Sequence, residues 1–193
     1  MAKYNYISFI SDMGTADESV AVCKSIMYQQ APGVTILDIT HEIKPFDVRS
    51  TSLVLCRAIQ LLPPGVVVVG VDPGIPKDQR YIAVEVESWV LIGPDNGVLA
   101  SAAQLLGDIK RAVEITNPDY RIQSPGAMFS ARDILCPAAG VVANGIDISQ
   151  LGQTLTLDQL VPGTLNLPLQ DEGGALIGEV WSIDRFGNVQ LNI

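Results

Sequence analysis

Two aspartates in this sequence stand directly after strand-like apolar runs, where they could grip a small polar ligand. Asp72 ends the β-branched run of residues 66–71, and Asp12 follows the apolar stretch of residues 4–10. A run such as 66–71 is typical of a central parallel strand that is buried on both faces. Open α/β sheets bind their ligands beyond the carboxyl ends of such strands. If both strands are central, we expect the two carboxylates to share one crevice.

The chemistry of these acids allows a functional and a structural interpretation. A carboxylate at a strand end can accept hydrogen bonds from both hydroxyls of a ribose, as an acidic residue does in other Rossmann-like sites. The segment Asp12-Met-Gly-Thr also supplies a flexible glycine. However, Asp is a common turn former, and the Pro-Gly that follows Asp72 is a good turn sequence. Taken alone, the two acids leave both interpretations open.

The elements that must position these acids alternate between strand and helix. We expect strands over residues 4–11, 34–40 and 66–71. Helices are expected between them, over residues 17–30 and 47–62. Asp17 and Asp47 stand at the starts of these helices, where an acidic cap suits the positive end. This order predicts an α/β fold with a Rossmann-like, doubly wound and mostly parallel sheet.

The second half of the chain predicts a hairpin, further helices and a C-terminal pair of strands. The hairpin covers residues 80–93, the helices 98–106 and 130–144, and the strands 111–116, 175–183 and 189–193. Residues 151–163 are rich in turn formers and are predicted to be a linker. A lone hairpin is marginal in water, so the last two strands need a partner in this domain, another subunit or a second domain.

Composition excludes several classes of function. Hydrophobic residues make up 48% of the chain and charged ones 17%, which predicts a globular protein. The net charge of −9 argues against binding to a nucleic-acid backbone, which needs clustered Lys and Arg. No apolar run is long enough to span a membrane, and the N-terminus lacks a signal-like core. We therefore expect a cytoplasmic protein with no nucleic-acid or membrane partner.

The sequence also predicts no metal and no resident cofactor. Cys23, Cys56 and Cys136 are far apart, and the single His makes a zinc site improbable, so the cysteines are interpreted as buried free thiols. The chain contains no G-x-x-x-x-G-K-[ST] motif and no G-x-G-x-x-G after its first strand. Neither a P-loop nor a standard dinucleotide site is supported.

His41 and Ser130 are further candidates for catalysis, and each has a structural explanation. His41 follows a predicted strand, and we favour a structural, hydrogen-bonded histidine over a catalytic one. Ser130-Ala-Arg-Asp133 fits a helix capping box. One histidine serves the whole chain, so no Ser-His-Asp triad can be assembled around Ser130.

Six motifs, taken together, resemble a known family. In chain order they are Phe9-Ile-Ser-Asp12-Met-Gly-Thr-Ala-Asp17-Glu-Ser19, Asp38-Ile-Thr-His41-Glu-Ile-Lys-Pro45-Phe-Asp47, Val71-Asp72-Pro-Gly74, Gly93-Pro-Asp-Asn-Gly97-Val-Leu99, Phe129-Ser-Ala-Arg132-Asp133 and Ile183-Asp184-Arg-Phe-Gly-Asn188-Val189. This set resembles the S-adenosyl-L-methionine hydroxide adenosyltransferase family, the relatives of the fluorinase and chlorinase. The resemblance covers nearly the whole chain.

The resemblance implies a fold and a reaction. It implies an α/β domain over residues 1–160, followed over residues 161–193 by a linker and the first strands of an apparently truncated C-terminal β-barrel domain. It implies S-adenosyl-L-methionine (SAM) as a small-molecule substrate. Water or hydroxide would attack the ribose C5′ and release adenosine and L-methionine. It further implies a homotrimer with the site at the subunit interface.

The resemblance also implies roles for individual residues. Asp72 would position the nucleophile, with Arg80 and Ser130 completing the catalytic set. Asp12 would hold the ribose hydroxyls. The other implied substrate contacts are Asp17 and Ser19 near the methionine end, Phe46 and Ala131, and Asp184 and Asn188 from the barrel side.

One position separates the branches of this family, and two others depart from its pattern. Halogenating relatives carry Tyr where this chain has Asp72, and a carboxylate should repel halide while accepting a hydrogen bond from water. The family Arg, seven residues after that Asp, is Gln79 here, with Arg80 next to it, and the family His is Ser130. The alternatives are a non-catalytic binder of SAM or adenosine, a chlorinase-like halide adenosyltransferase, and a flavodoxin-like domain of unrelated function.

Overall fold

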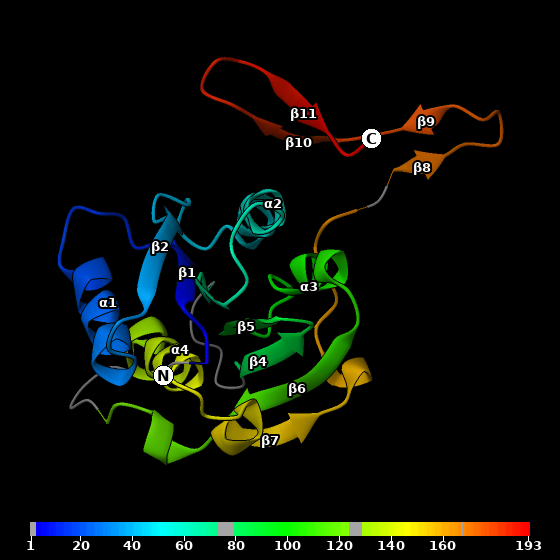
Figure 1. The fold of residues 1–193 in the computed structure, drawn as a ribbon. Helices are drawn as coiled ribbons and strands as arrows, with labels where there is room; N and C mark the ends of the chain where they lie inside the picture. Colours follow the sequence, from blue (N-terminus) through cyan, green and yellow to red (C-terminus); the bar gives the residue numbers. More distant parts are fainter. Residues whose placement is uncertain (1–2, 73–78, 124–128, 167) are drawn as a thin grey trace.

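A seven-stranded sheet forms the centre of the computed structural model, which describes residues 3–72, 79–123, 129–166 and 168–193 (Figure 1). The strand order is β2-β1-β3-β5-β4-β6-β7. The strands are β1 (Tyr6–Ser11), β2 (Thr35–Thr40), β3 (Val66–Gly70), β4 (Tyr81–Val86), β5 (Trp89–Pro94), β6 (Ile109–Ile115) and β7 (Gly152–Leu155). Strands β2, β1, β3 and β5 are parallel to one another, whereas β4 is antiparallel to both of its neighbours, β5 and β6.

Helices cover both faces of this sheet, as the doubly wound prediction requires. Helices α1 (Ser19–Gln30) and α4 (Cys136–Ala143) pack together on one face. Helices α2 (Val48–Ile59) and α3 (Ala100–Leu106) pack together on the other (Figure 1). The core is accordingly divided into two clusters, one beneath each pair of helices. The α/β prediction is confirmed.

Strand β3 is buried on both faces, as its β-branched sequence predicts. The side chains of residues 66 and 68 enter one core cluster and those of residues 67 and 69 the other, and all four are fully buried. Burial of one such side chain contributes roughly 1.5–3 kcal/mol. The strand that leads to Asp72 is therefore firmly fixed.

The two early helices begin differently. Asp47 is the N-cap of α2, and its carboxylate accepts the backbone N–H of Ser50 at 2.9 Å, as predicted. The N-cap of α1 is Glu18, which makes no capping hydrogen bond. Asp17 instead accepts the N–H of Ser19 at 2.9 Å in the turn just before that helix.

The predicted linker over residues 151–163 is wrong. It holds the end of the 3₁₀ helix η3 (Ile148–Leu151), strand β7 and the 3₁₀ helix η4 (Leu157–Gln159). Strand β7 pairs with β6, and Leu151 and Leu155 are buried. Gly152 begins this strand because a Cβ there would lie 2.2 Å from the carbonyl oxygen of Glu114. Gly152, which in the sequence resembles a turn residue, therefore allows β7 to pair closely with β6.

The predicted helix over residues 130–144 is divided in two. A π-helical turn, η2 (Ala131–Leu135), leads into α4, and Pro137 sits in the first turn of α4, where proline is tolerated. Ser130 makes no capping hydrogen bond. The Asp133 carboxylate reaches back to the N–H of Phe129 at 2.9 Å, so the predicted capping box is wrong about Ser130.

Two short hairpins end the chain. They are β8 (Leu169–Gln170) with β9 (Leu176–Ile177), and β10 (Val180–Ile183) with β11 (Val189–Leu191). The second surrounds residues 184–188 as predicted, but the expected strand over 175–183 is broken at residues 178–179. Figure 1 shows both hairpins beyond α2 and α3, outside the central sheet. Within the described ranges no helix has the length and apolarity that crossing a bilayer requires.

Candidate functional site

Asp12 and Asp72 leave the sheet at the same edge. Strands β1 and β3 are parallel neighbours, and their last residues, Ser11 and Gly70, lie opposite one another. Burial raises the pKa of Asp72, and the nearby charge of Asp12 raises this pKa further. The structure therefore brings the two predicted acids within electrostatic reach of each other. Residues 73–76, the rest of the motif that Asp72 opens, lie outside the described residues.

The two oxygens of the Asp72 carboxylate have different surroundings. Oδ2 accepts a hydrogen bond from the Tyr81 hydroxyl at 2.8 Å. Oδ1 is buried and has no hydrogen-bond partner in the described part of the chain. A buried carboxylate oxygen without a partner is energetically unfavourable. This oxygen is therefore an unsatisfied acceptor, to which a bound ligand or water would donate a hydrogen bond.

Tyr81 connects Asp72 to Ser130. It is the first residue of β4 and is only 4% exposed. Burial and the hydrogen bond to Asp72 raise the pKa of Tyr81 to about 12, against the lowering effects of a side-chain hydrogen bond with Ser130 and of the Arg121 charge. The phenol therefore stays protonated at neutral pH. Two predicted catalytic residues, Asp72 and Ser130, meet through a third residue that the sequence did not suggest.

Arg80 is not part of this cluster. Its guanidinium forms an ion pair with Asp95 at 2.5 Å and donates to the backbone carbonyl of Gln159. Consecutive residues of a strand point to opposite faces, so Tyr81 and Arg80 cannot both reach Asp72. The side-chain amide of Gln79 donates to the carbonyl of Arg80 at 2.9 Å. The structure therefore does not bring Arg80 to Asp72, and the catalytic role of Arg80 stays a prediction.

The Asp12 carboxylate joins two loops. Its Oδ2 accepts the backbone N–H of Phe46 at 2.8 Å. Partial burial raises the pKa of Asp12, although this hydrogen bond opposes the shift. Phe46 has a φ of +67° and is 59% exposed to solvent. A non-glycine residue at positive φ is strained, and such residues are frequent at functional sites. The arrangement leaves the Phe46 ring free to cover a ligand.

A buried hydrogen-bond chain holds the segment that carries Asp12. Ser11 Oγ lies 2.7 Å from His41 Nδ1, and His41 Nε2 lies 3.2 Å from Asp38. The backbone N–H of Gly14 donates to the carbonyl of His41 at 2.7 Å. His41 is therefore buried and hydrogen-bonded, as predicted. Ser11 is fully buried, so this Ser-His-Asp arrangement offers no accessible nucleophile.

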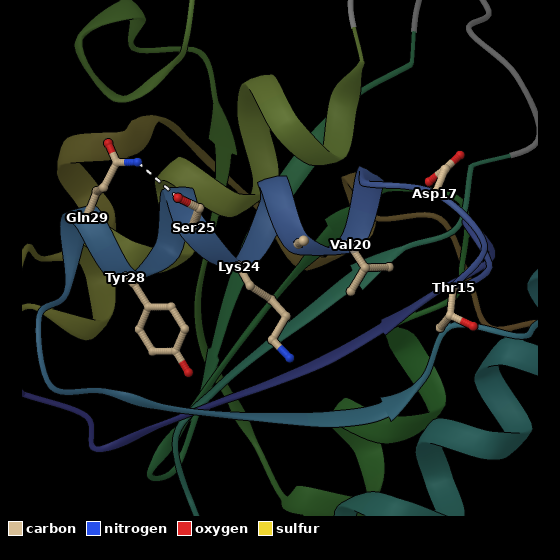
Figure 2. A pocket seen from close by; sticks show the side chains of 8 residues that line it. Thr15, Asp17, Val20, Lys24, Ser25, Tyr28 and Gln29 are labelled. Atoms are coloured by element: carbon tan, nitrogen blue, oxygen red, sulfur yellow. Dashed lines mark hydrogen bonds between the residues drawn. The ribbon is translucent and has the colours of Figure 1, made fainter.

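Asp17 lies at one end of an open groove of about 700 Å³ along α1 (Figure 2). Figure 2 shows Val20, Lys24 and Tyr28 extending from the helix, with Thr15 and Asp17 in the loop that precedes it. The Lys24 ammonium pairs with Asp38 at 2.8 Å. The hydrogen bonds from Ser19 lower the pKa of Asp17. The groove includes one predicted ligand contact, Asp17, and its lining does not include Asp12 or Asp72.

The remaining predicted contacts lie in two different places, with Asp184 and Asn188 in the C-terminal hairpin and Ala131 beside Gly70 at the end of β3. Asp184 accepts hydrogen bonds from Phe186 and Asn188 within its own turn between β10 and β11. The bonds from Asn188 lower the pKa of Asp184. Ala131 is 2% exposed and lies in the core near Gly70. The side chain of Ala131 therefore supports the turn after Ser130 and presents little surface to a ligand.

Neither Tyr81 nor Arg121 was predicted from the sequence as a site residue. Strand alternation could have indicated Tyr81, because it must face opposite to Arg80 on the predicted strand. Arg121 follows the 3₁₀ helix η1 (Pro118–Tyr120), and its Nη2 donates to the carbonyl of Ile115 at the end of β6. No sequence pattern indicates that this arginine would approach Tyr81.

Comparison with known proteins agrees with the family that the motifs suggested. The model of the SAM hydroxide adenosyltransferase N-terminal domain matches residues 7–152. A Salinispora arenicola protein named (R)-S-adenosyl-L-methionine hydrolase is 40% identical over 192 residues, which cover 99% of this chain and 73% of that protein. The chain therefore belongs to the SAM hydroxide adenosyltransferase family.

More distant comparisons support the same assignment. A fluorinase of Actinoplanes sp. is 29% identical over 212 residues, covering 97% of this chain and 71% of the fluorinase. The crystal structure of an uncharacterized conserved protein from Thermotoga maritima superimposes with a TM-score of 0.87 at 34% identity. That match covers 97% of this chain and 71% of the other.

Proposed function

We propose that this protein hydrolyses SAM to adenosine and L-methionine by attack of water on the ribose C5′. The observation that carries the proposal is the Asp72 carboxylate, with one oxygen held by Tyr81 and the other buried and unpaired beside Asp12. The relatives named (R)-S-adenosyl-L-methionine hydrolase support the same substrate and reaction.

The reaction needs positioning more than strong acid catalysis. The sulfonium sulfur of SAM is already a good leaving group. As the C5′–O bond forms, the C5′–S bond breaks and its electron pair stays on sulfur, giving neutral methionine thioether. The proton of the attacking water passes to the Asp72 carboxylate and then to solvent. The site contributes an aligned nucleophile and exclusion of bulk water.

The other residues would bind the substrate. Asp12 would accept hydrogen bonds from the ribose hydroxyls, and the exposed Phe46 ring, which Asp12 anchors through its backbone, would cover the adenosyl group. Asp17 and Ser19 would lie near the methionine end. Ser130 would act through the Tyr81 hydroxyl, which it contacts.

Asp184 and Asn188 would reach the site from a neighbouring subunit. In one chain their turn is exposed, and the two residues are hydrogen-bonded to each other. The strands beside this turn carry apolar side chains that are more than half exposed, such as Ile183 and Val189. We propose a homotrimer in which these hairpins cover the Asp12–Asp72 edge of another copy. The strands after residue 168 lie outside the central sheet, which supports a domain boundary near residue 160.

A second candidate is a SAM or adenosine binder without turnover. Gln79 occupies the place of the family Arg, and Arg80 is engaged by Asp95, so no Arg from this segment reaches Asp72 in the described part of the chain. A halide adenosyltransferase is disfavoured, because the ionised Asp72 would repel a halide ion.

One incubation separates these functions. Purified protein is mixed with SAM in ¹⁸O-labelled water, with and without chloride, and the nucleosides are analysed by mass spectrometry. The proposal predicts adenosine with ¹⁸O at its 5′ position, formed at the same rate in chloride. A 5′-chloro product would indicate the transferase. Calorimetric binding of SAM without any product would indicate the binder. In the Asp72→Ala protein, labelled adenosine should fall to the background rate.

A further inference from the structure

The hydroxyl of Tyr81 lies at the centre of the polar cluster around Asp72. It donates to Asp72 Oδ2 at 2.8 Å, and Ser130 is the neighbour that lowers the pKa of Tyr81 by acting as a hydrogen-bond donor to the phenol. Tyr81 is 4% exposed, so water does not replace either contact. Among the described residues, Tyr81 is the hydrogen-bond donor to the Asp72 carboxylate, because the side chains of Gln79 and Arg80 have other partners.

The directions of these hydrogen bonds follow from the chemistry of the three groups. An ionised carboxylate is only an acceptor, so the single Tyr81 proton points to Asp72. Ser130 must then donate its hydroxyl proton to the Tyr81 oxygen. The result is a directed chain from Ser130 through Tyr81 to Asp72. Successive hydrogen bonds that run in one direction polarise and strengthen each other.

Arg121 supports the same chain from the segment that follows β6 and η1. Glu114 of β6 lies opposite Ile82, which places the end of β6 beside Tyr81. The Arg121 guanidinium donates to the carbonyl of Ile115, and its Nε is buried without a hydrogen-bond partner among the described residues. Its positive charge favours the phenol oxygen as an acceptor of the Ser130 proton.

We propose that Tyr81 is a positioning residue for the hydrolysis proposed above, holding Asp72 Oδ2 so that the free Oδ1 faces the attacking water. This inference rests on that proposed function. Without the phenol, the carboxylate could rotate about its Cβ–Cγ bond and present either oxygen. With it, the free oxygen keeps one direction and takes the proton of the water as C5′–O bond formation proceeds.

The test is the Tyr81→Phe variant, assayed for adenosine formation across pH. We expect kcat to fall about 10- to 100-fold, with KM for SAM unchanged within about twofold, because alignment is lost and substrate contacts remain. The acidic limb of the kcat/KM profile should move to higher pH. The Tyr81 hydrogen bond lowers the pKa of Asp72, so its removal raises the pH at which the carboxylate becomes ionised.

Tyr6→Phe is the matched control, because Tyr6 begins β1 at the opposite end of the sheet. It should leave rate and profile unchanged. Ser130→Ala is the second variant, which keeps the phenol and removes its donor. It should lower kcat by a smaller factor and shift the acidic limb in the same direction. It decides the question if Tyr81→Phe fails to fold by circular dichroism.

The outcomes distinguish this inference from the proposed function. An active wild-type protein whose Tyr81→Phe variant has unchanged kcat and an unmoved acidic limb overturns the role of Tyr81 alone. A wild-type protein that forms no adenosine overturns both. A lowered kcat with an unmoved limb shows a structural effect only and also overturns the inference.

Discussion

At the scale of single residues, Asp72 is placed where ionisation is unfavourable. Burial and the charge of Asp12 raise its pKa, and the hydrogen bond from Tyr81 only partly offsets this. A group whose pKa is raised by folding stabilises the fold below its unfolded pKa, and this contribution is lost as pH rises through its folded pKa. The same property that makes Asp72 a better base thus weakens the folded state at neutral pH.

The first prediction concerns this conflict. Asp72→Asn should abolish adenosine formation and raise Tm by about 1–3 °C at pH 8, because the unfavourable charge is gone. At pH 4 the difference from wild type should be smaller, since a larger fraction of Asp72 is protonated there than at pH 8. Differential scanning calorimetry at both pH values measures it. Asp158→Asn, at an exposed acid of η4, controls for the loss of one surface charge. A Tm below that of wild type at pH 8 would contradict the argument.

The second prediction concerns Asp12. Asp12→Asn keeps an acceptor for the Phe46 N–H but removes the charge that raises the pKa of Asp72. The acidic limb of the kcat/KM profile should therefore move to lower pH, opposite to the shift expected for Tyr81→Phe. KM should rise about 10-fold, because each neutral hydrogen bond to a ribose hydroxyl is weaker than one to a carboxylate. Steady-state kinetics across pH would show both effects. If the acidic limb lay at the same pH in wild type and in Asp12→Asn, the charge of Asp12 would have no effect on the pKa of Asp72, which would contradict the prediction.

At the scale of elements, the segment after β2 fixes both a helix and the site. Asp47 caps α2 through the N–H and hydroxyl of Ser50, at 2.9 and 2.6 Å. Its neighbour Phe46 is held by Asp12. Burial acts to raise the pKa of Asp47, but the Ser50 hydrogen bonds outweigh it and the net pKa is lowered. The cap therefore stabilises the fold above its unfolded pKa, and this is lost as pH falls through the lower folded value.

The third prediction is that Asp47→Ala lowers the free energy of unfolding by about 1 kcal/mol at pH 7. Denaturant titration measures this loss, which should disappear as pH falls through the lowered folded pKa of Asp47. The matched control is Glu18→Ala at the N-cap of α1, which makes no capping hydrogen bond. This control should change stability by less than about 0.5 kcal/mol. Equal losses in the two variants would rule out a specific cap.

Local sequence signals predicted most elements, because each was encoded within its own segment. The apolar run of β3, the Asp47 cap and the hairpin of β4 and β5 needed no distant partner to be recognised. Strand β7 was missed because its pairing partner, β6, is remote in sequence and its first residue is a glycine. The meeting of Asp12 and Asp72 followed from strand order, whereas the approach of Arg121 to Tyr81 depends on tertiary packing.

Arg80 and Tyr81 show how narrowly a site prediction can fail. The sequence placed both residues at the start of the correct strand. A family resemblance favoured the charged one, but its neighbour Tyr81 makes the hydrogen bond to Asp72. The ion pair of Arg80 with the buried Asp95 fixes the register of β4 against β5, because a shift of the strand by one residue would break this ion pair.

At the scale of the whole molecule, the two C-terminal hairpins expose apolar surface. Leu169, Ile183 and Phe186 are 66%, 65% and 84% exposed. Clustered exposed apolar side chains of this kind mark an interaction surface. The hairpin of β10 and β11 is joined to α2 through Arg49 with Glu179 and Arg57 with Gln190, so polar contacts orient it on the chain while its apolar side chains stay exposed.

The fourth prediction is that the protein sediments as a trimer of about 62 kDa, three times the chain mass of 20.6 kDa. Phe186→Asp should shift it towards monomer, because a charge in an apolar interface is strongly unfavourable. SAM turnover should fall in parallel. Leu61→Asp, at the 91% exposed residue after α2, is the control and should remain trimeric. Sedimentation equilibrium distinguishes the species, and a monomeric, fully active wild type would rule out the shared site.

Strand β4 runs against its neighbours, and this reversal has a consequence for how the site can vary. Parallel strands deliver only their final residues to the ligand edge, but an inverted strand delivers its opening residue there, as Tyr81 opposite Pro94 illustrates. A single substitution at that opening position can exchange the group facing an existing acid while every parallel pairing stays intact. Relatives that share this reversed strand can therefore differ in chemistry without differing in architecture.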